Sequence, residues 1–205
     1  MTATLPASNA LLIATTNSGK IEEFNAMSRN FGLSFLSLTD VGINMEVRET
    51  GTTFEENAIL KAEAYGETSK LVTVADDSGL EVTALGGKPG VLSARYAGLG
   101  ATDAANIDLL LERLKDVPED LRTARFRCVI ALKAPHEPPK LYTGVCKGRI
   151  TRIPRGEHGF GYDPVFFIPQ IGKTMAELTP DEKNSISHRG HAVRGLAKEL
   201  ASSCE

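Results

Sequence analysis

The spacing of apolar residues predicts an alternation of strands and helices over the first half of the chain. Apolar runs of strand type stand at 11–14, 31–38, 71–75 and 80–82. One helix is expected to begin near Ile21, and a longer one follows the capping box of Thr53 and Glu56. The longer helix carries an apolar stripe at Phe54, Ala58, Ala62 and Tyr65. We expect Lys61 and Glu55 to fall outside this stripe, on a solvated face.

The second half of the chain adds a hairpin and further helices to this pattern. An amphipathic helix is expected over 102–115, and its leucines are typical of a core face. Alternating apolar residues at 125–134 and 140–150 predict the two strands of a hairpin. A second capping box begins at Thr179 and places Lys183 on a helix. Because hairpins are antiparallel whereas strand–helix–strand units are parallel, we predict an α/β fold with a mixed sheet.

Two adjacent carboxylates follow the apolar run that ends at Ala75. Asp76, Asp77, Ser78 and Gly79 all favour turns, so we expect a turn here, with both carboxylates at the end of a strand. Successive side chains on a strand face opposite ways, so only one of the two can aim at a given ligand while the other braces it. A purely structural turn explains the same four residues, and only the rest of the chain favours chemistry at this position.

Composition and charge are those of an ordinary globular protein of the cytoplasm. The chain has 205 residues, enough for one domain, which we place at 1–205. Its net charge of −3 gives no basic excess, so a nucleic-acid polymer is not expected as a partner. The three cysteines have no CxxC spacing, which fits a reducing compartment. No apolar run spans a bilayer, and the first 20 residues lack the charge order of a signal peptide, so no membrane is expected.

The segment after the first strand has the composition of a phosphate-binding loop. It reads TTNSGK at 15–20, and it connects a strand to a helix. Free amides at a helix N-terminus attract anions, small residues let a phosphate approach, and Lys20 adds a full charge. The segment is not a Walker A loop, because Ile21 stands where that motif requires serine or threonine. A simple cluster of capping residues explains the composition equally well.

The last third of the chain holds a second set of polar and aromatic signals. Glycines flank Phe160 and Tyr162 in a loop, an arrangement that suits a flat ligand. His188 and Arg189 stand at the far end of the helix that carries Lys183 or at the start of the closing helix. The four histidines and unpaired thiols have no spacing typical of zinc, so a zinc site is not expected.

Six motifs in order give the chain a family resemblance from Leu12 to Leu196. They are TTNSGK, ETGTTFEENAILKA at 49–62, ADDSGL, LGGKPGVLSARY, GFGYDP and EKNSISHRG. With these motifs the chain resembles the inosine triphosphate pyrophosphatase family, which hydrolyses non-standard purine nucleoside triphosphates such as ITP, dITP and XTP to the monophosphate and pyrophosphate. The chain departs from many relatives at Thr16, where they carry glycine, a change that we expect to stiffen the loop without loss of phosphate binding.

The resemblance implies a metal-assisted reaction on a small nucleotide. It implies that Glu49 and Asp77 hold Mg²⁺ and that Asp77 orients or deprotonates the attacking water. The substrate-binding residues that it implies are Thr15, Thr16, Asn17, Ser18, Gly19, Lys20, Lys61, Ser78, Phe160, Gly161, Tyr162, Asp163, Lys183, His188 and Arg189. A hard ion such as Mg²⁺ takes oxygen ligands and keeps several waters, so two carboxylates and substrate phosphates suffice.

Within that set, the resemblance divides the work between phosphates and base. Residues 15–20 are expected to hold the triphosphate, and Lys61 and Lys183 to neutralise it. Residues 160–163 are expected to embrace the base, whose edge His188 and Arg189 would read. The resemblance also implies an elongated fold with a central mixed sheet flanked by helices, two lobes with an active-site cleft between them, and a homodimer.

Two other functions remain open from the residues. A related enzyme of the same fold could act on pyrimidine or modified-base nucleotides, and the complete base-reading set, Phe160, Tyr162, His188 and Arg189, argues against it. A non-catalytic nucleotide-binding module has no need for Glu49, Asp76 and Asp77 near phosphates. Serine hydrolase chemistry is the least favoured, because Ser78 lacks the G-x-S-x-G elbow.

Overall fold

The described residues, 10–28 and 31–202, form a seven-stranded mixed sheet in this computed structural model. Along the sheet the strand order is β2-β1-β3-β4-β5-β6-β7. The strands are β1 (Ala10–Ile13), β2 (Ser34–Ser37), β3 (Thr73–Val82), β4 (Thr123–Lys133), β5 (Lys140–Ile150), β6 (Phe166–Ile168) and β7 (Lys173–Thr174). Strand β1 pairs parallel with β2 and β3, whereas β6 pairs antiparallel with β5 and β7. The predicted α/β class with a mixed sheet is confirmed.

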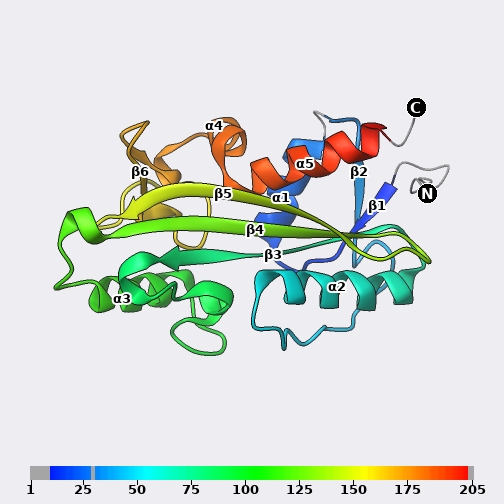
Figure 1. Cartoon of the computed structure of the whole chain (residues 1–205), viewed down its shortest axis with the longest axis horizontal. Helices are drawn as coiled ribbons and strands as arrows, with labels where there is room; N and C mark the ends of the chain where they lie inside the picture. The colour runs from blue at the N-terminus through cyan, green and yellow to red at the C-terminus, as the bar shows by residue number, and fades with distance from the viewer. Residues whose placement is uncertain (1–9, 29–30, 203–205) are drawn as a thin grey trace. The chain divides into compact units, whose positions relative to one another are not determined.

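Five α-helices flank the sheet within the described residues (Figure 1). They are α1 (Ser18–Ser28), α2 (Phe54–Ser69), α3 (Asp103–Arg113), α4 (Pro180–Ile186) and α5 (His188–Ser202). Both predicted capping boxes are present, at Thr53 before α2 and at Thr179 before α4. Among the described residues no helix is both long and apolar enough to cross a membrane. The expectations for Cys204 and for the first nine residues fall outside the described residues.

The chain divides into two compact units made of interleaved segments. The first unit contains residues 1–77, 128–144 and 189–205, and the second contains residues 78–127 and 145–188. Strands β3, β4 and β5 each contribute residues to both units. The expectation of one domain over 1–205 stays a prediction.

The first unit buries its apolar residues on both faces of its part of the sheet. On one face, Phe24 of α1 and Val193 and Leu196 of α5 pack against strand residues such as Leu11 and Val74. On the other face lies α2, and Figure 1 shows α2 on one side of the strands with α1 and α5 on the other. The predicted stripe of α2 is buried at Phe54, Ala58, Ala62 and Tyr65. A side chain on β3 in this unit therefore faces either α2 or the pair α1 and α5.

The second unit has its own apolar core around helix α3. Ile107 and Leu110 of α3 pack in one cluster with Leu80 and Val82 of β3 and with Phe166 of β6. Arg122 is fully buried in this unit, and its guanidinium donates to the carbonyl oxygens of Leu114, Val117 and Thr151. The predicted leucine-rich core helix and the predicted strands of the hairpin are both present.

The turn predicted at Asp76, Asp77, Ser78 and Gly79 is wrong. All four residues lie inside β3, which runs without a break from Thr73 to Val82. Their preference for turns is outweighed by tertiary contacts, because both carboxylates are buried against cations and amide donors from other elements. The two carboxylates therefore stand in the middle of a strand rather than at its end.

Two smaller predictions also need correction. Helix α1 begins at Ser18 rather than near Ile21, so Lys20 lies in its first turn. The solvated face predicted for Lys61 is wrong, since Lys61 is only 9% exposed. At 3.6 residues per turn, Asn57 and Lys61 lie beside Ala58 and Ala62 on the buried face of α2. The polar ends of Asn57 and Lys61 both contact the buried carboxylate of Asp77.

Candidate active site

On the α1 and α5 face of the first unit, Asp76 is the centre of a buried ionic network. The Asp76 side chain has no exposed surface, and its Oδ2 lies 3.1 Å from Lys20 Nζ and 3.2 Å from Arg189 Nη2. Arg189 also donates from Nη1 to Glu23 Oε2 at 2.5 Å. Lys20 and Glu23 come from α1 and Arg189 from the first turn of α5, so Asp76 ties both helices to β3.

Asp76 is held as a carboxylate by these cations. Burial alone would raise its pKa, but the charges of Lys20, Arg189 and Lys61 outweigh burial and hold the pKa well below the ordinary 3.8. The pKa of Arg189 is raised in turn, since Asp76 and Glu23 outweigh the effect of burial. Asp76 therefore stays ionised at neutral pH and is unsuited to exchange a proton there.

On the α2 face of the same unit, Asp77 belongs to a different cluster. Its Oδ2 accepts a hydrogen bond from Asn57 Nδ2 at 3.1 Å, and its Oδ1 lies 3.4 Å from Lys61 Nζ. Lys61 Nζ also lies 2.6 Å from Oε1 of Glu49. Both Lys61 and Asn57 come from α2, so this helix brings Glu49 and Asp77 to one ammonium group.

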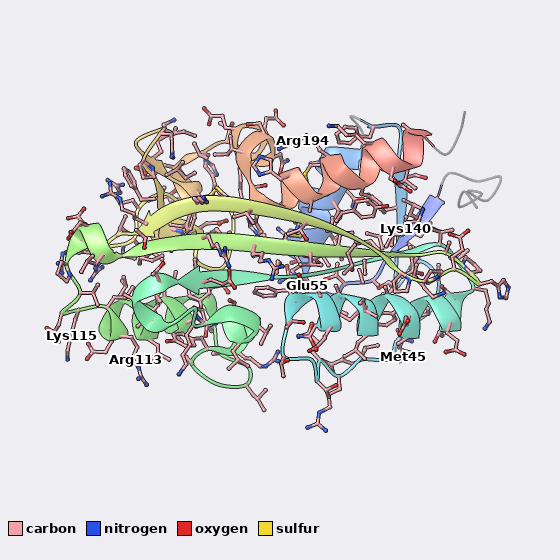
Figure 2. All side chains as sticks on the ribbon, viewed as in Figure 1. Met45, Glu55, Arg113, Lys115, Lys140 and Arg194 are labelled. Carbon is pink, nitrogen blue, oxygen red and sulfur yellow. The ribbon has the colours of Figure 1, made fainter. Side chains whose placement is uncertain are left out.

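The segment that carries Glu49 is fastened along α2. Tyr65 donates its hydroxyl proton to the carbonyl oxygen of Met45 and accepts from the amide of Val47. Gly51 donates its amide to Asn57 Oδ1 at 2.8 Å, and a Cβ at Gly51 would stand 2.6 Å from that oxygen. Figure 2 labels Met45 on this segment beside α2. The position of Glu49 is therefore set by the same helix that supplies Asn57 and Lys61.

The pKa of Asp77 is raised, in contrast to that of Asp76. Burial is the main cause, the Glu49 charge adds to it, and the cations Lys61 and Lys20 only partly oppose it. Lys61 keeps its charge, because Asp77, Asp76 and Glu49 raise its pKa against the effect of burial. An acid whose carboxylate is disfavoured by its surroundings accepts a proton more readily than a free aspartate does, which is the property of a general base.

The predicted phosphate loop lies between β1 and the first turn of α1. Thr16, Asn17 and Ser18 are exposed, while Thr15, Gly19 and Lys20 are half-buried. Asn17 Oδ1 accepts the amide of Lys20 at 3.0 Å, and Thr15 Oγ1 accepts the amide of Asn17 at 3.2 Å. Asn17 therefore caps α1, and the exposed residues 16–18 lie at the start of this helix.

In the second unit, Phe160, Asp163 and Lys183 form a compact cluster. The Lys183 ammonium bonds Asp163 Oδ2 and stands 4.8 Å from the centre of the Phe160 ring, and the Phe160 amide donates to the same oxygen at 2.9 Å. Gly159 has φ of +77°, and a Cβ there would stand 2.1 Å from Asp163 Oδ2, so only glycine fits this turn. The half-buried Phe160 ring is thereby held at the surface of the unit beside a cation.

The other residues predicted in this unit differ in burial, and Tyr162 and His188 are the buried ones among them. Tyr162 is 4% exposed and donates its hydroxyl proton to the carbonyl oxygen of Ser93 at 2.9 Å. Gly161 donates its amide to Asp103 Oδ2 at 2.7 Å, and Ser78 is half-buried on β3. His188 is 5% exposed and stacks on Phe126 with ring centres 4.7 Å apart.

A divalent cation fits the donor set around Lys61. The carboxylates of Glu49 and Asp77 approach the same ammonium nitrogen, so both can contribute oxygen to one site for a hard ion. Among the described residues there is no group of three or more histidine, cysteine, aspartate or glutamate side chains suited to a metal. An ion here would take its other ligands from water or from a ligand's phosphates, which is the usual habit of Mg²⁺.

Comparison with known proteins identifies the family. The model of the Ham1 family matches residues 11–199. This chain belongs to the Ham1 family. Among curated Ham1 relatives, a Bacillus subtilis protein named dITP/XTP pyrophosphatase is 51% identical over 189 residues, which are 92% of this chain and 96% of the relative. A Shigella flexneri protein of the same name is 51% identical over 192 residues, 93% of this chain and 97% of the relative.

Solved Ham1 structures share the fold as well. The structure of a HAM1 protein from Coxiella burnetii superposes with a TM-score of 0.86 at 44% identity, and the match covers 94% of this chain and 98% of that one. The sequence resemblance to the inosine triphosphate pyrophosphatase family is thus confirmed at the level of family and fold.

Some residues of the candidate site were not predicted from the sequence. Asn57 binds Asp77, and Glu23 binds Arg189, yet neither was singled out. Asn57 could have been recognised from the sequence, because it is a polar residue beside the apolar stripe of α2 and is buried there. Nothing in the sequence distinguishes Glu23, since an acid on a helix is usually solvated. The structure also shows that Arg189, predicted to read a base, directs all three guanidinium nitrogens to Asp76 or Glu23.

Proposed function

We propose that this chain is a nucleoside triphosphate pyrophosphatase that acts on non-standard purine nucleotides of the dITP and XTP type. The observation that carries the proposal is the cluster of Glu49, Lys61 and Asp77, in which two carboxylates approach one ammonium group. The naming of the Ham1 relatives supports the same activity. The products are the nucleoside monophosphate and pyrophosphate.

Asp77 is the proposed catalytic residue. Water attacks the phosphorus next to the nucleoside, a new P–O bond forms, and the bond to the bridging oxygen breaks so that pyrophosphate leaves. Asp77 orients the water and takes its proton, a role that a carboxylate can perform where it lies within hydrogen-bond reach of the attacking water. Glu49 and Asp77 would hold Mg²⁺, which supplies positive charge for the phosphates when it is bound.

The phosphate chain is proposed to bind residues 15–20 and the nearby cations. Exposed hydroxyl and amide groups at the start of α1 can donate to phosphate oxygens, and Lys20 and Lys61 balance their charge. Lys183 is proposed to assist in the second unit, where its charge already lies beside Phe160. Catalysis of phosphoryl transfer depends mainly on such positioning and charge neutralisation.

The base is proposed to stack on Phe160. Phe160 is the half-buried aromatic ring of the predicted set 160–163, whereas the Tyr162 side chain belongs to the core. Ser78, Gly161, Tyr162 and Asp163 would act mainly by shaping the surroundings of substrate. His188 and Arg189 remain the proposed readers of the 6-oxo group. An imidazole N–H is a donor, and each Arg189 Nη carries a second hydrogen besides the one directed to Asp76 or Glu23.

Three further properties belong to this proposal. The chain is proposed to act as a homodimer, in the cytoplasm, on a small nucleotide rather than on nucleic acid. The net charge of −3 supports a small-molecule partner over a nucleic-acid polymer. Mg²⁺ is the proposed cofactor because both proposed ligands are carboxylates.

A panel of nucleotides tests the proposed function. Pyrophosphate release is measured with Mg²⁺ for dITP, XTP, ITP, GTP, ATP and a pyrimidine triphosphate. The expected kcat/KM is greatest for dITP, XTP and ITP. It should be lower for ATP by about 10⁴-fold, since the 6-amino group of adenine leaves donors aimed at a 6-oxo group unpaired. Preference for the pyrimidine nucleotide would favour the related-enzyme alternative, and binding without turnover would favour a binding module.

A further inference from the structure

A pocket in the second unit is lined by arginines that the proposed reaction does not use. The pocket has a volume of about 260 Å³ and lies at the end of β5 and the segment that follows it. Its lining includes Glu119, Arg149, Thr151, Arg152, Arg155 and Phe167. None of these residues belongs to the candidate site, and three of the eight residues that line the pocket carry a permanent positive charge.

Two of the arginines are arranged around one aromatic ring. Arg149 on β5 and Phe167 on β6 are register partners in the sheet, so their side chains share one face. The Cζ atoms of Arg149 and Arg155 lie 5.7 Å and 5.3 Å from the centre of the Phe167 ring. Contact with the ring limits the motion of both guanidinium groups, which lowers the entropy lost when they bind a ligand.

The backbone beneath the arginines is held on both sides of the pocket. The amide of Arg155 donates to the carbonyl oxygen of Pro164 at 2.8 Å, and its own carbonyl oxygen accepts from Thr174 Oγ1 at 2.8 Å. The amide of Thr151 donates to Val165, and its carbonyl oxygen accepts from buried Arg122 at 2.9 Å. The arginines therefore extend from a fixed frame rather than from a loose loop.

Charge in and around the pocket is positive in sum. Glu119 is the single acid of the lining, against three arginines. Arg155 also approaches Glu177, but at 3.8 Å, and Glu177 Oε2 is engaged more closely by the amide of Thr174 at 2.6 Å. Burial and the charge of Arg152 lower the pKa of Arg122, and the charge of Glu119 only partly opposes them.

We propose that this pocket is a second anion site, which binds a compact polyanion of the phosphate or pyrophosphate type. Arginine forks bind phosphate oxygens in pairs, and three forks around one pocket suit a ligand with several such oxygens. A volume of about 260 Å³ is below the roughly 300–1,000 Å³ of pockets for drug-sized molecules, which favours a small anion over a whole nucleotide. The Phe167 ring already contacts the guanidinium groups of Arg149 and Arg155, so stacking of a base on this ring would have to displace them.

Calorimetry on the full chain tests this site separately from the proposed active site. All proteins carry Lys20→Ala to weaken the proposed phosphate loop, and EDTA removes metal. Inorganic pyrophosphate is titrated into this background, into Arg149→Gln with Arg155→Gln, and into the control Lys88→Gln with Arg113→Gln. The control removes two exposed charges from the same unit, and Figure 2 labels Arg113 at the end of α3.

The expected result is pyrophosphate binding that the arginine pair variant weakens at least tenfold and the control leaves unchanged. Hydrogen exchange should slow at 149–155 and 166–168 on addition of pyrophosphate, and a nucleoside monophosphate should bind more weakly than pyrophosphate. Equal affinity in the arginine variant and the control would overturn the proposal, as would protection confined to residues 15–20. With Lys20 intact, the arginine variant should hydrolyse dITP at the wild-type rate, so the two sites can fail independently.

Discussion

Asp76 and Asp77 are neighbours in the chain and identical in chemistry, yet they stand in opposite surroundings on the two faces of β3. Asp76 faces α1 and α5, where Lys20 and Arg189 hold it as a permanent carboxylate. Asp77 faces α2, where burial and Glu49 raise its pKa and Lys61 lies slightly farther away. Alternation along a strand is what separates the two side chains.

The comparison teaches that a residue's partners, more than its type, determine its role. On the Asp76 face every charge is matched by an opposite charge, so this face can hold helices together but has little capacity to take a proton. On the Asp77 face two acids share one ammonium group, so there is negative charge in excess that a metal or a proton can neutralise. We therefore assign a structural role to Asp76 on the first face and water activation to Asp77 on the second.

The largest expected effect is the loss of turnover in Asp77→Asn. Asparagine keeps the shape and the contact with Asn57 but can neither accept a proton nor bind a metal with full charge, so kcat for dITP should fall by about 10³-fold or more. The measurement is steady-state pyrophosphate release at saturating Mg²⁺. A kcat within a few fold of wild type would remove Asp77 from the reaction.

Asp76→Asn should act on stability instead. The change leaves Arg189 and Lys20 without their buried carboxylate, and breaking a buried ion pair from one side costs about 3–5 kcal/mol. Urea unfolding gives the free energy of unfolding, with the exposed Asp116→Asn as a control that should change it by less than about 0.5 kcal/mol. A loss for Asp76→Asn no greater than that of the control would contradict the structural role.

Lys20 pairs with Asp76 and is also a proposed phosphate ligand, so its replacement should have an intermediate effect. If it also binds phosphate, Lys20→Ala should raise KM for dITP by about 10–100-fold, the usual range for a hydrogen bond to a charged group. Lys140→Ala is the matched control, because Lys140 pairs with Glu199 at 2.7 Å on the surface of the same unit. An unchanged KM in Lys20→Ala would confine Lys20 to its contact with Asp76.

The smallest expected effect is a difference in how the stabilities of Asp76→Asn and Asp77→Asn depend on pH. Asp76 has a lowered pKa, so its stabilising contribution is complete above 3.8 and falls as pH drops below that value. Asp77 has a raised pKa, so wild type loses stability relative to Asp77→Asn as pH rises above 3.8. Unfolding free energies of both variants between pH 3 and 6 should therefore diverge from wild type in opposite directions.

The sequence predicted the family and most elements, because capping boxes and apolar spacing are local signals. The boxes at Thr53 and Thr179 and the stripe on α2 are all present. It failed at Asp76 to Gly79, where local turn preference opposes the strand and only distant partners decide the outcome. Neither partner, Arg189 nor Lys61, can be matched to its carboxylate from spacing, since 113 and 16 residues separate the pairs.

Carbon-13 NMR of the aspartate carboxyl groups in the metal-free protein tests the division between the two faces most directly. The signals of Asp76 and Asp77 are assigned by comparison with the two asparagine variants and followed as the pH is lowered. The account predicts that Asp77 titrates above 3.8, while Asp76 stays ionised as long as the protein is folded. Titration of both groups at the same pH, or of Asp76 above Asp77, would contradict it.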